Sequence, residues 1–376
     1  MEEQIISVYL HCRFMNFKDY FMDESNYTIK DIARISGVSI GTVDRVLHHR
    51  GNVSEEKLAR VQKVLDEIHY QPNVFAIGLA AKKQYKLACL LPQFEEGDYW
   101  SEVYCGVLRA ANEVRPFNVS INFYLYVYGN RESFIQTCAS VVFDETDALL
   151  IAPGPEKCTL SFCQKLHEKK IPFAFIDFNI PQANPLCYIG QDSKESGYLT
   201  AKILTHNHSI SEDDELLLVF TEGGDNSVDL QRKNRFEGFL KFLKEKKDRM
   251  VIHEVALSKT DAVSNERILD NFFDMYPKAL YVAAFNSRIY LIGNYLKKKK
   301  KGLKGLIGFD LLDKNVELLK GGVVDSLIAQ RPGTQAYRGI KVLCDYIVFK
   351  KEVPVVIHMP IDILYKENVD YYYEFI

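Results

Sequence analysis

Polar side chains stand at the ends of several apolar, strand-length runs in the second part of this sequence. Asp177 and Asp310 each end such a run, and Asn286 and Gln330 hold comparable positions after two others. In open α/β sheets, ligands bind outside the carboxyl ends of the strands. These groups are therefore candidates for one binding site, although each alone could equally be a cap or a turn former.

A second candidate group is the tripeptide Asp98-Tyr99-Trp100, which lies where a loop meets the next predicted helix. An aromatic ring can stack on the apolar face of a sugar, and a carboxylate can accept hydrogen bonds from its hydroxyls. Trp100 is the single tryptophan of the chain and could instead serve helix packing. Together with the strand-end groups, this chemistry favours a hydroxyl-rich ligand, such as a sugar or a sugar derivative.

Three short helices are predicted in the first part of the chain. Thr28 is placed to cap the first helix and Gly37 to end it, while Ser39 and Ser54 are placed to cap the next two. Pro72 stops the third helix. The predicted buried stripe of this third helix consists of Leu58, Val61, Val64, Leu65 and Ile68. Three short helices with such stripes can share one small core.

From residue 86 onward, apolar runs of strand length alternate with amphipathic helical segments. The predicted strands are 86–92, 119–128, 148–153, 172–177, 215–222, 251–257, 279–285, 305–309 and 325–330. The predicted helices include 130–143, 156–170, 192–208, 229–246 and 287–300. This alternation predicts parallel sheets covered on both faces. The pattern restarts after Tyr188, which predicts two lobes and a ligand cleft between them.

Charge is distributed unevenly along the chain. The whole sequence has a formal net charge of −3. Residues 28–86 hold ten Lys/Arg and six Asp/Glu, so this stretch is basic and the remainder is more acidic than the average suggests. A basic head on an acidic body predicts a polyanionic partner for the head alone.

Several classes of function lack a supporting pattern. No apolar run approaches the roughly 20 residues needed to cross a membrane, and acidic Glu2 and Glu3 make the start a poor signal peptide. No His/Cys cluster has zinc spacing, Gly223-Gly224 lacks a following Gly-Lys-Ser/Thr, and no motif indicates a catalytic triad or a pair of catalytic carboxylates. We therefore expect a cytoplasmic protein that is not an enzyme, with no metal, cofactor or membrane contact.

The segment TIKDIARISGVSIGTVDRV (28–46), followed by NVSEEKLARVQKVLDEIHYQPN (52–73), closely resembles the lac-repressor/galactose-repressor family. The resemblance implies a helix-turn-helix whose second helix enters the major groove of operator DNA. By this resemblance, the base-reading positions are Ile40, Gly41 and Arg45. The residues that contact phosphates or cap a helix are Thr28, Ser39 and Thr42.

The predicted base-reading face departs from the family pattern. Arg45 can donate two hydrogen bonds to a guanine edge, although it could also contact phosphates alone. Ile40 and Gly41 replace a polar pair that is common in the family; the isoleucine could touch a thymine methyl group, and the glycine reads nothing. Asp44 replaces a common serine. These departures bear on the operator sequence and leave the resemblance intact.

In the same family, the linker after the head folds into a hinge helix on DNA, and a leucine wedges between base steps of the minor groove. Leu79 matches that wedge. Such a wedge costs unstacking energy, which extra contacts must offset. The alternative is an ordinary linker that contains an apolar residue.

The part after residue 86 resembles type I periplasmic sugar-binding proteins, as the sensors of this family do. The sequence RFEGF (235–239) matches an Arg-x-x-Gly-aromatic motif, in which the arginine donates to effector oxygens. The resemblance therefore adds Arg235 to the candidate effector residues Asp98, Tyr99, Trp100, Asp177, Asn286, Asp310 and Gln330.

We expect an N-terminal extension (1–26), a small all-α helix-turn-helix domain (27–71), a hinge linker (72–85) and a two-lobed α/β sensor (86–376). Lobe 1 is expected at 86–188 and 331–351, and lobe 2 at 189–330 and 352–376. The expected function is ligand-responsive transcriptional regulation by a homodimer on operator DNA, sensing a sugar or sugar derivative and controlling carbohydrate-use genes. The alternative is a cytosolic, receptor-like sugar-binding protein without DNA function.

Overall fold

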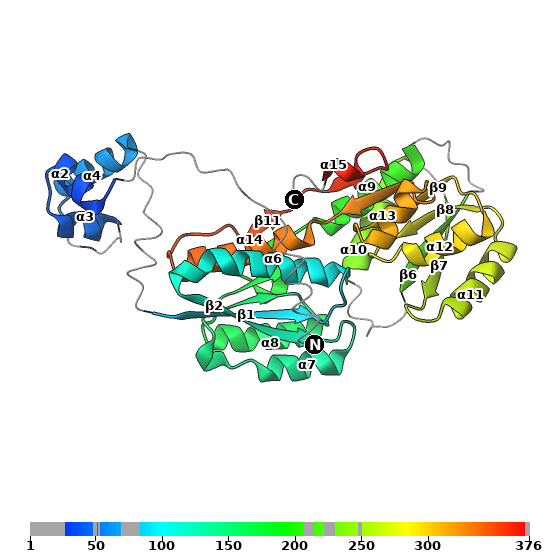
Figure 1. The fold of residues 1–376 in the computed structure, drawn as a ribbon, viewed down its shortest axis with the longest axis horizontal. Helices are drawn as coiled ribbons and strands as arrows, with labels where there is room; N and C mark the ends of the chain where they lie inside the picture. Colours follow the sequence, from blue (N-terminus) through cyan, green and yellow to red (C-terminus); the bar gives the residue numbers. More distant parts are fainter. Residues whose placement is uncertain are drawn as a thin grey trace. The chain divides into compact units, whose positions relative to one another are not determined.

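The computed structural model describes residues 27–47, 51, 53–68, 83–206, 214–221, 230–246 and 250–372. Within these ranges, the chain forms a helical head and a larger α/β body, each compact by itself (Figure 1). Leu79, residues 1–26 and most of the predicted hinge linker lie outside the described residues.

The head consists of α2 (Ile29–Ser36), α3 (Ile40–Leu47) and α4 (Glu55–Glu67). Thr28 forms a complete capping box at the start of α2. Gly37 ends that helix with a φ of 67°, a backbone conformation that favours glycine. The shared core of the head is formed by Ile32, Ala33, Val43, Val46, Val61 and Val64. Local signals in the sequence therefore predicted these three helices correctly.

Two details of α4 differ from the prediction. Ser54 holds the N-cap position, but its side chain makes no capping hydrogen bond. Leu58 was predicted to be buried and is 45% exposed, so the buried stripe of α4 is narrower than its sequence suggests. Three helices this short enclose a core of only a few side chains, which leaves no room for every apolar residue of the stripe.

Lobe 1 of the body contains a six-stranded parallel sheet with the order β11-β5-β4-β3-β1-β2. Its strands are β1 (Tyr85–Pro92), β2 (Val119–Tyr126), β3 (Ala148–Ile151), β4 (Phe173–Ile176), β5 (Cys187–Gly190) and β11 (Val356–His358). One face is covered by α6 (Tyr99–Val114) and α14 (Pro332–Ile347), and the other by α7 (Arg131–Ser140) and α8 (Glu156–Glu168) (Figure 1). Short 3-10 turns lie at Arg115–Phe117, Phe143–Glu145 and Pro181–Ala183.

Lobe 2 contains a second six-stranded sheet with the order β12-β10-β9-β8-β6-β7, in which only β12 is antiparallel. Its strands are β6 (Glu215–Thr221), β7 (Val251–Leu257), β8 (Ala279–Ala284), β9 (Gly305–Phe309), β10 (Ser326–Ala329) and β12 (Asp362–Leu364). The helices α9 (Ser193–His206) and α10 (Leu230–Lys246) pack on one apolar cluster. A second cluster is covered by α11 (Ala262–Met275), α12 (Tyr290–Lys299) and α13 (Asp313–Lys320). The short helix α15 (Val369–Tyr372) follows β12.

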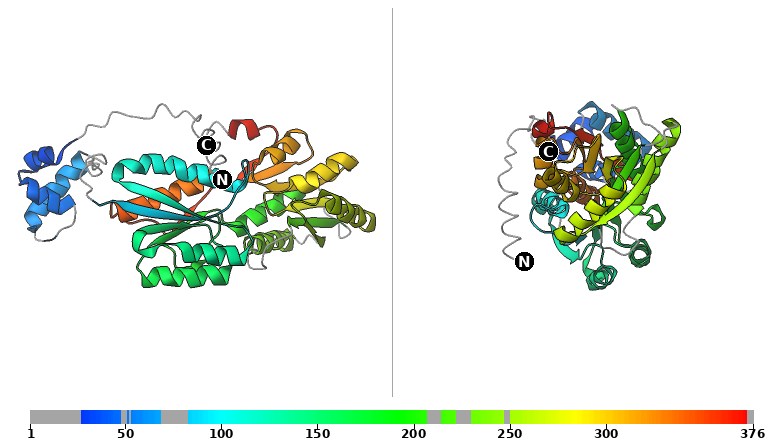
Figure 2. Two further views of the ribbon diagram at one scale, coloured as in Figure 1. Left: turned by 60° about the horizontal axis from the view of Figure 1, so that its bottom comes forward. Right: turned by 90° about the vertical axis from the view of Figure 1, so that its right-hand side faces the viewer.

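Each sheet is a central layer with helices on both faces, which the two views of Figure 2 also show. All nine predicted strands are present, but β5, β11 and β12 were not foreseen. Because β11 pairs with β5, residues 356–358 belong to lobe 1, whereas the sequence had placed everything after 351 in lobe 2. Length alone does not explain these misses, because β3, β4 and β10 were predicted and have four residues each. The place of β5, β11 and β12 is set by the strands with which they pair.

Glycines allow two pairs of helices to pack with their backbones in close approach. A Cβ atom at Gly106 on α6 would lie 2.0 Å from the carbonyl oxygen of Gly333 on α14. A Cβ atom at Gly238 on α10 would lie 1.8 Å from the carbonyl oxygen of Lys194 on α9. The glycine of the RFEGF motif therefore has a packing role, which fixes the position of α10 on its lobe.

Candidate functional site

Arg235 is the anchor of the candidate effector site and is only 1% exposed. Its Nη1 donates to the carbonyl oxygen of Phe285 at 2.6 Å, and its Nη2 donates to Oε1 of Gln330 at 2.6 Å. The guanidinium carbon lies 3.8 Å from the ring centroid of Phe309. Arg235 precedes Gly238 by one helical turn, so the close approach of α10 to α9 holds the arginine in place.

Asp310 follows the carboxyl end of β9 and is 4% exposed. Gln330, which follows β10, donates from Nε2 to both carboxylate oxygens of Asp310, at 2.9 and 3.0 Å. Burial raises the pKa of Asp310 to about 7, while the charge of Arg235 and the bond from Gln330 act to lower that pKa. Asp310 has a φ of 68°, an uncommon conformation for a non-glycine residue and one that often marks a functional site.

Lobe 1 contributes a carboxylate and a phenol. Asp177 follows β4 with a φ of 65°, and its Oδ1 accepts a hydrogen bond of 2.7 Å from the hydroxyl of Tyr99 at the start of α6. Burial raises the pKa of Asp177, whereas the Tyr99 bond and the charge of Arg235 act to lower it. Gln231 of α10, in lobe 2, donates to the Asp177 carbonyl oxygen at 3.3 Å. Groups from both lobes thus meet at one place.

Two glutamines form hydrogen bonds that link this site to the segments that cross between the lobes. Gln335 accepts from the Asp177 backbone N–H at 2.9 Å and donates to the Gln330 carbonyl oxygen at 2.8 Å. Gln191 donates to the carbonyl oxygens of Ala329 and Pro360, at 2.7 and 2.8 Å. The sequence analysis missed both residues: Gln191 directly follows β5, a strand that was not predicted, and Gln335 lies within α14.

Three predicted effector residues make other contacts. Asn286 donates to Thr221 Oγ1 at 3.2 Å and accepts from the Arg288 backbone N–H at 2.8 Å, which is the turn-forming alternative. Trp100 packs edge-on against Tyr99, with ring centroids 5.1 Å apart, and lies 6.0 Å from Tyr128.

Asp98 holds the N-cap position of α6 without a capping hydrogen bond, and its Oδ2 lies 3.9 Å from Nζ of Lys259 in lobe 2. The structure therefore brings together Tyr99, Asp177, Arg235, Asp310 and Gln330. Asp98, Trp100 and Asn286 lie beside this group.

The head presents a separate candidate surface on α3. Val43 and Val46 face the core, whereas Ile40 is 50% exposed and Gly41 and Arg45 are also exposed. A Cβ atom at Gly41 would meet nothing within 4 Å, so this position is open. The exposed face of α3 therefore contains all three predicted base-reading positions.

Three further head residues make local capping contacts. Thr28 Oγ1 donates to Asp31 at 2.6 Å. Ser39 Oγ accepts from the Thr42 backbone N–H at 3.2 Å and lies 2.9 Å from the Thr42 hydroxyl. Thr28 and Ser39 therefore serve as helix caps, and whether they or Thr42 also contact phosphates is a separate prediction.

Comparison with known proteins relates both units to one family. Residues 28–73 match the profile described as bacterial regulatory proteins, lacI family, and residues 87–351 match the periplasmic binding protein domain. A crystal structure assigned as a LacI transcriptional regulator from Bacteroides fragilis is 38% identical, with a TM-score of 0.70, and covers 77% of this chain and 100% of that chain. The chain belongs to the lacI family of bacterial regulatory proteins. The predicted fold class, a helix-turn-helix head and a body like type I periplasmic binding proteins, is thereby confirmed.

Two curated relatives match only part of this lacI-family protein. The transcriptional regulator DegA of Bacillus subtilis is 27% identical over 219 residues, which cover 58% of this chain and 61% of DegA. MalR of Streptococcus pneumoniae is 26% identical over 172 residues, or 46% of this chain and 51% of MalR. The chain thus matches little more than half the length of these curated relatives. GanP, a glucose-galactose binding protein from Geobacillus stearothermophilus, shares the fold at 20% identity, with a TM-score of 0.64 over 77% of this chain and 99% of GanP.

Proposed function

We propose that this lacI-family protein is a ligand-responsive, DNA-binding transcriptional regulator that acts in the cytoplasm as a homodimer. The observation that carries the proposal is that one chain holds both an exposed, arginine-bearing α3 face in a lacI-type head and a buried cluster of charges shared by two lobes. Buried charged groups are costly unless they are paired or serve a function. In this proposal, the cluster senses a ligand and the head binds DNA.

The ligand in this proposal is a carbohydrate, and the regulated genes serve carbohydrate use. Asp177, Asp310 and Gln330 offer acceptors, and Tyr99 offers an aromatic ring. Nε of Arg235 is a buried donor with no hydrogen-bond partner among the described residues. Sugar hydroxyls both donate and accept hydrogen bonds, which suits such a mixed set. Asp98, Trp100 and Asn286 would line the edge of the same site.

On DNA, we propose that Ile40, Gly41 and Arg45 face base edges and that Thr28, Ser39 and Thr42 face the phosphate backbone. Leu79, outside the described residues, would enter the minor groove. One recognition helix reads only a few base pairs, so two heads on a near-palindromic site are needed for useful specificity.

Genomic footprinting in cells tests this function directly. We expect discrete, near-palindromic sites for the wild-type protein, enriched near genes of carbohydrate use, and loss of those sites for Arg45→Ala at equal protein abundance. A uniform footprint for both proteins would contradict the DNA-binding function and favour the receptor-like alternative.

A further inference from the structure

We propose that the sensor site selects an uncharged carbohydrate and rejects carbohydrates that carry a phosphate or a carboxylate. This inference rests on the proposed function, because it concerns the ligand of the same sensor site. It deepens that function by fixing the charge of the ligand, which follows from the balance of buried charges around the site.

Among the described residues, acidic groups outnumber basic groups at the centre of the site. Asp177 and Asp310 come from different lobes, and Arg235 is the cation that their electrostatic surroundings share. The structure records no ion pair within 4 Å between Arg235 and either of these two described carboxylates. Burial raises the pKa of both carboxyl groups in spite of the arginine, which indicates incomplete compensation of their charge. An anionic ligand would add negative charge beside Asp177 and beside Asp310, a carboxyl group that is ionised on about half of the molecules at pH 7.

The guanidinium of Arg235 already uses two of its five N–H groups within the protein. Its two terminal nitrogens donate to Phe285 and Gln330, and its plane lies over Phe309. Only Nε is left without a hydrogen-bond partner among the described side chains. A phosphate or carboxylate is best bound by a guanidinium that offers two parallel donors. Arg235 keeps Nε–H and one further N–H on each terminal nitrogen. The buried carboxylates of Asp177 and Asp310 already act on its charge, so an anionic ligand would have to compete with them for these donors.

Cations around this centre have acidic partners of their own. Arg331 donates to Asp362 at 2.6 Å. Lys259 lies 3.9 Å from Asp98, and Arg232 lies 3.8 Å from Glu254. These contacts reduce what each cation could offer to an anionic ligand.

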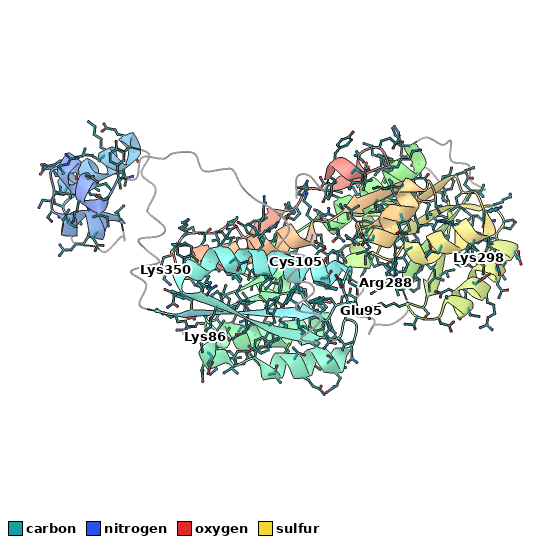
Figure 3. All side chains as sticks on the ribbon, in the orientation of Figure 1. Lys86, Glu95, Cys105, Arg288, Lys298 and Lys350 are labelled. Atoms are coloured by element: carbon teal, nitrogen blue, oxygen red, sulfur yellow. The ribbon has the colours of Figure 1, made fainter. Side chains whose placement is uncertain are left out.

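Arg288, labelled in Figure 3, is a half-exposed cation on the turn after β8. Water and salt partly screen a charge at such a position. Arg288 is nevertheless the cation through which an anionic sugar could bind, and the test below includes it.

Calorimetry with the full chain and matched sugar probes tests the inference. The neutral probes are D-glucose, D-galactose, L-arabinose and D-allose. D-Glucose and D-galactose are each matched by a 6-phosphate and a uronate, L-arabinose by its 5-phosphate and D-allose by its 6-phosphate. We expect at least one neutral sugar to bind and its anionic counterparts to bind at least about 100-fold more weakly, because like charges in a desolvated site repel strongly.

Variants test the cause of this preference. Asp310→Asn and Asp177→Asn each remove one negative charge. Each should therefore reduce the ratio of the affinity for a neutral sugar to the affinity for its anionic counterpart, even if both affinities change. Asp274→Asn, at an exposed position on α11, is the matched control and should leave the ratio unchanged.

Two results would overturn the inference. One is an anionic sugar that binds as tightly as its neutral counterpart, including one whose binding is lost in Arg288→Ala. The other is the failure of every neutral sugar to bind. Failure of the proposed regulatory function would appear separately, as the absence of discrete genomic sites for the wild-type protein.

Discussion

Arg45 and Arg235 are both central to this account, but their surroundings give the two arginines different chemistry. Arg45 is exposed on α3 and can adjust its fork of donors to a base edge. Arg235 is buried, held by Phe285 and Gln330, and burial lowers its pKa while the nearby carboxylates act to raise it. The Arg45 side chain can therefore change its conformation when it meets DNA, whereas the Arg235 side chain is already held in one position by the protein.

Arg45→Ala should weaken binding to the cognate operator by about 1–3 kcal/mol, because a bidentate contact to guanine is lost. Binding to random DNA should fall much less. Fluorescence anisotropy titrations at a fixed salt concentration measure both affinities. Arg60→Ala, which removes an exposed arginine of α4 that pairs with Glu56, is the control. Equal losses on cognate and random DNA would show that Arg45 contacts only phosphates.

Asp310 should make the stability of the body depend on pH. Its folded-state pKa, about 7, is raised above its ordinary value, so the folded protein holds this proton more tightly than the unfolded chain. The stability from Asp310 is therefore full below about pH 4 and is lost as the pH rises through 7.

Denaturant titrations of wild type and Asp310→Asn from pH 5 to 8 measure this effect. Relative to the variant, the wild type should lose stability as the pH rises, with a slope of at most about 1.4 kcal/mol per pH unit. Subtracting the variant's stability removes the opposite trend of exposed carboxylates with lowered pKa values, such as Glu237. A stability difference that does not change with pH would contradict the assignment.

The helices and strands that the sequence predicts are those whose ends or periods are set by neighbouring residues in the chain. The capping box at Thr28 and the left-handed Gly37 are local features, and the structure contains both. The strands β5, β11 and β12 are set by their neighbours in the sheets and leave no periodic signal of their own. Strand ends similarly pointed to Asp177, Asp310 and Gln330, whereas Gln335 depends on contacts across 158 and 5 residues of sequence.

Gln335 should couple the two lobes, because it bonds to Asp177 of lobe 1 and to Gln330, which holds both Arg235 and Asp310. We expect Gln335→Ala to bind operator normally and to reduce the effect of ligand on operator affinity by about 0.5–2 kcal/mol. Operator titrations with and without the sugar identified by calorimetry measure this coupling. Gln136→Ala, at an exposed position on α7, is the control. Unchanged coupling in Gln335→Ala would show that this residue only supports packing.

Specific recognition of DNA by the whole molecule requires two copies of the chain. A single α3 helix reads too few base pairs for specificity, so a symmetric dimer should occupy the two halves of a near-palindromic operator. Sedimentation velocity of the full chain, free and with operator DNA, should give a dimer in both cases. A monomer under both conditions would contradict this arrangement.

In the proposed function, a ligand held by the body changes how the head binds DNA. A ligand can shift DNA affinity only through its differential affinity for two arrangements of the protein, which for coupled sites amounts to about 5–150-fold. Arg235 is the residue on which that claim depends most. Because Arg235 is fully buried, its variant must first show a cooperative melting transition, and Tyr99→Phe provides a milder second variant.

Operator titration with and without the sugar identified by calorimetry tests this claim most directly. For the wild type, the sugar should change operator affinity within that range. Arg235→Ala should bind operator nearly as well as the wild type and lose the response, and Tyr99→Phe should reduce it. If Arg235→Ala still binds the sugar and responds normally, Arg235 is structural and the effector site lies elsewhere; if the wild type does not respond, the central claim is contradicted.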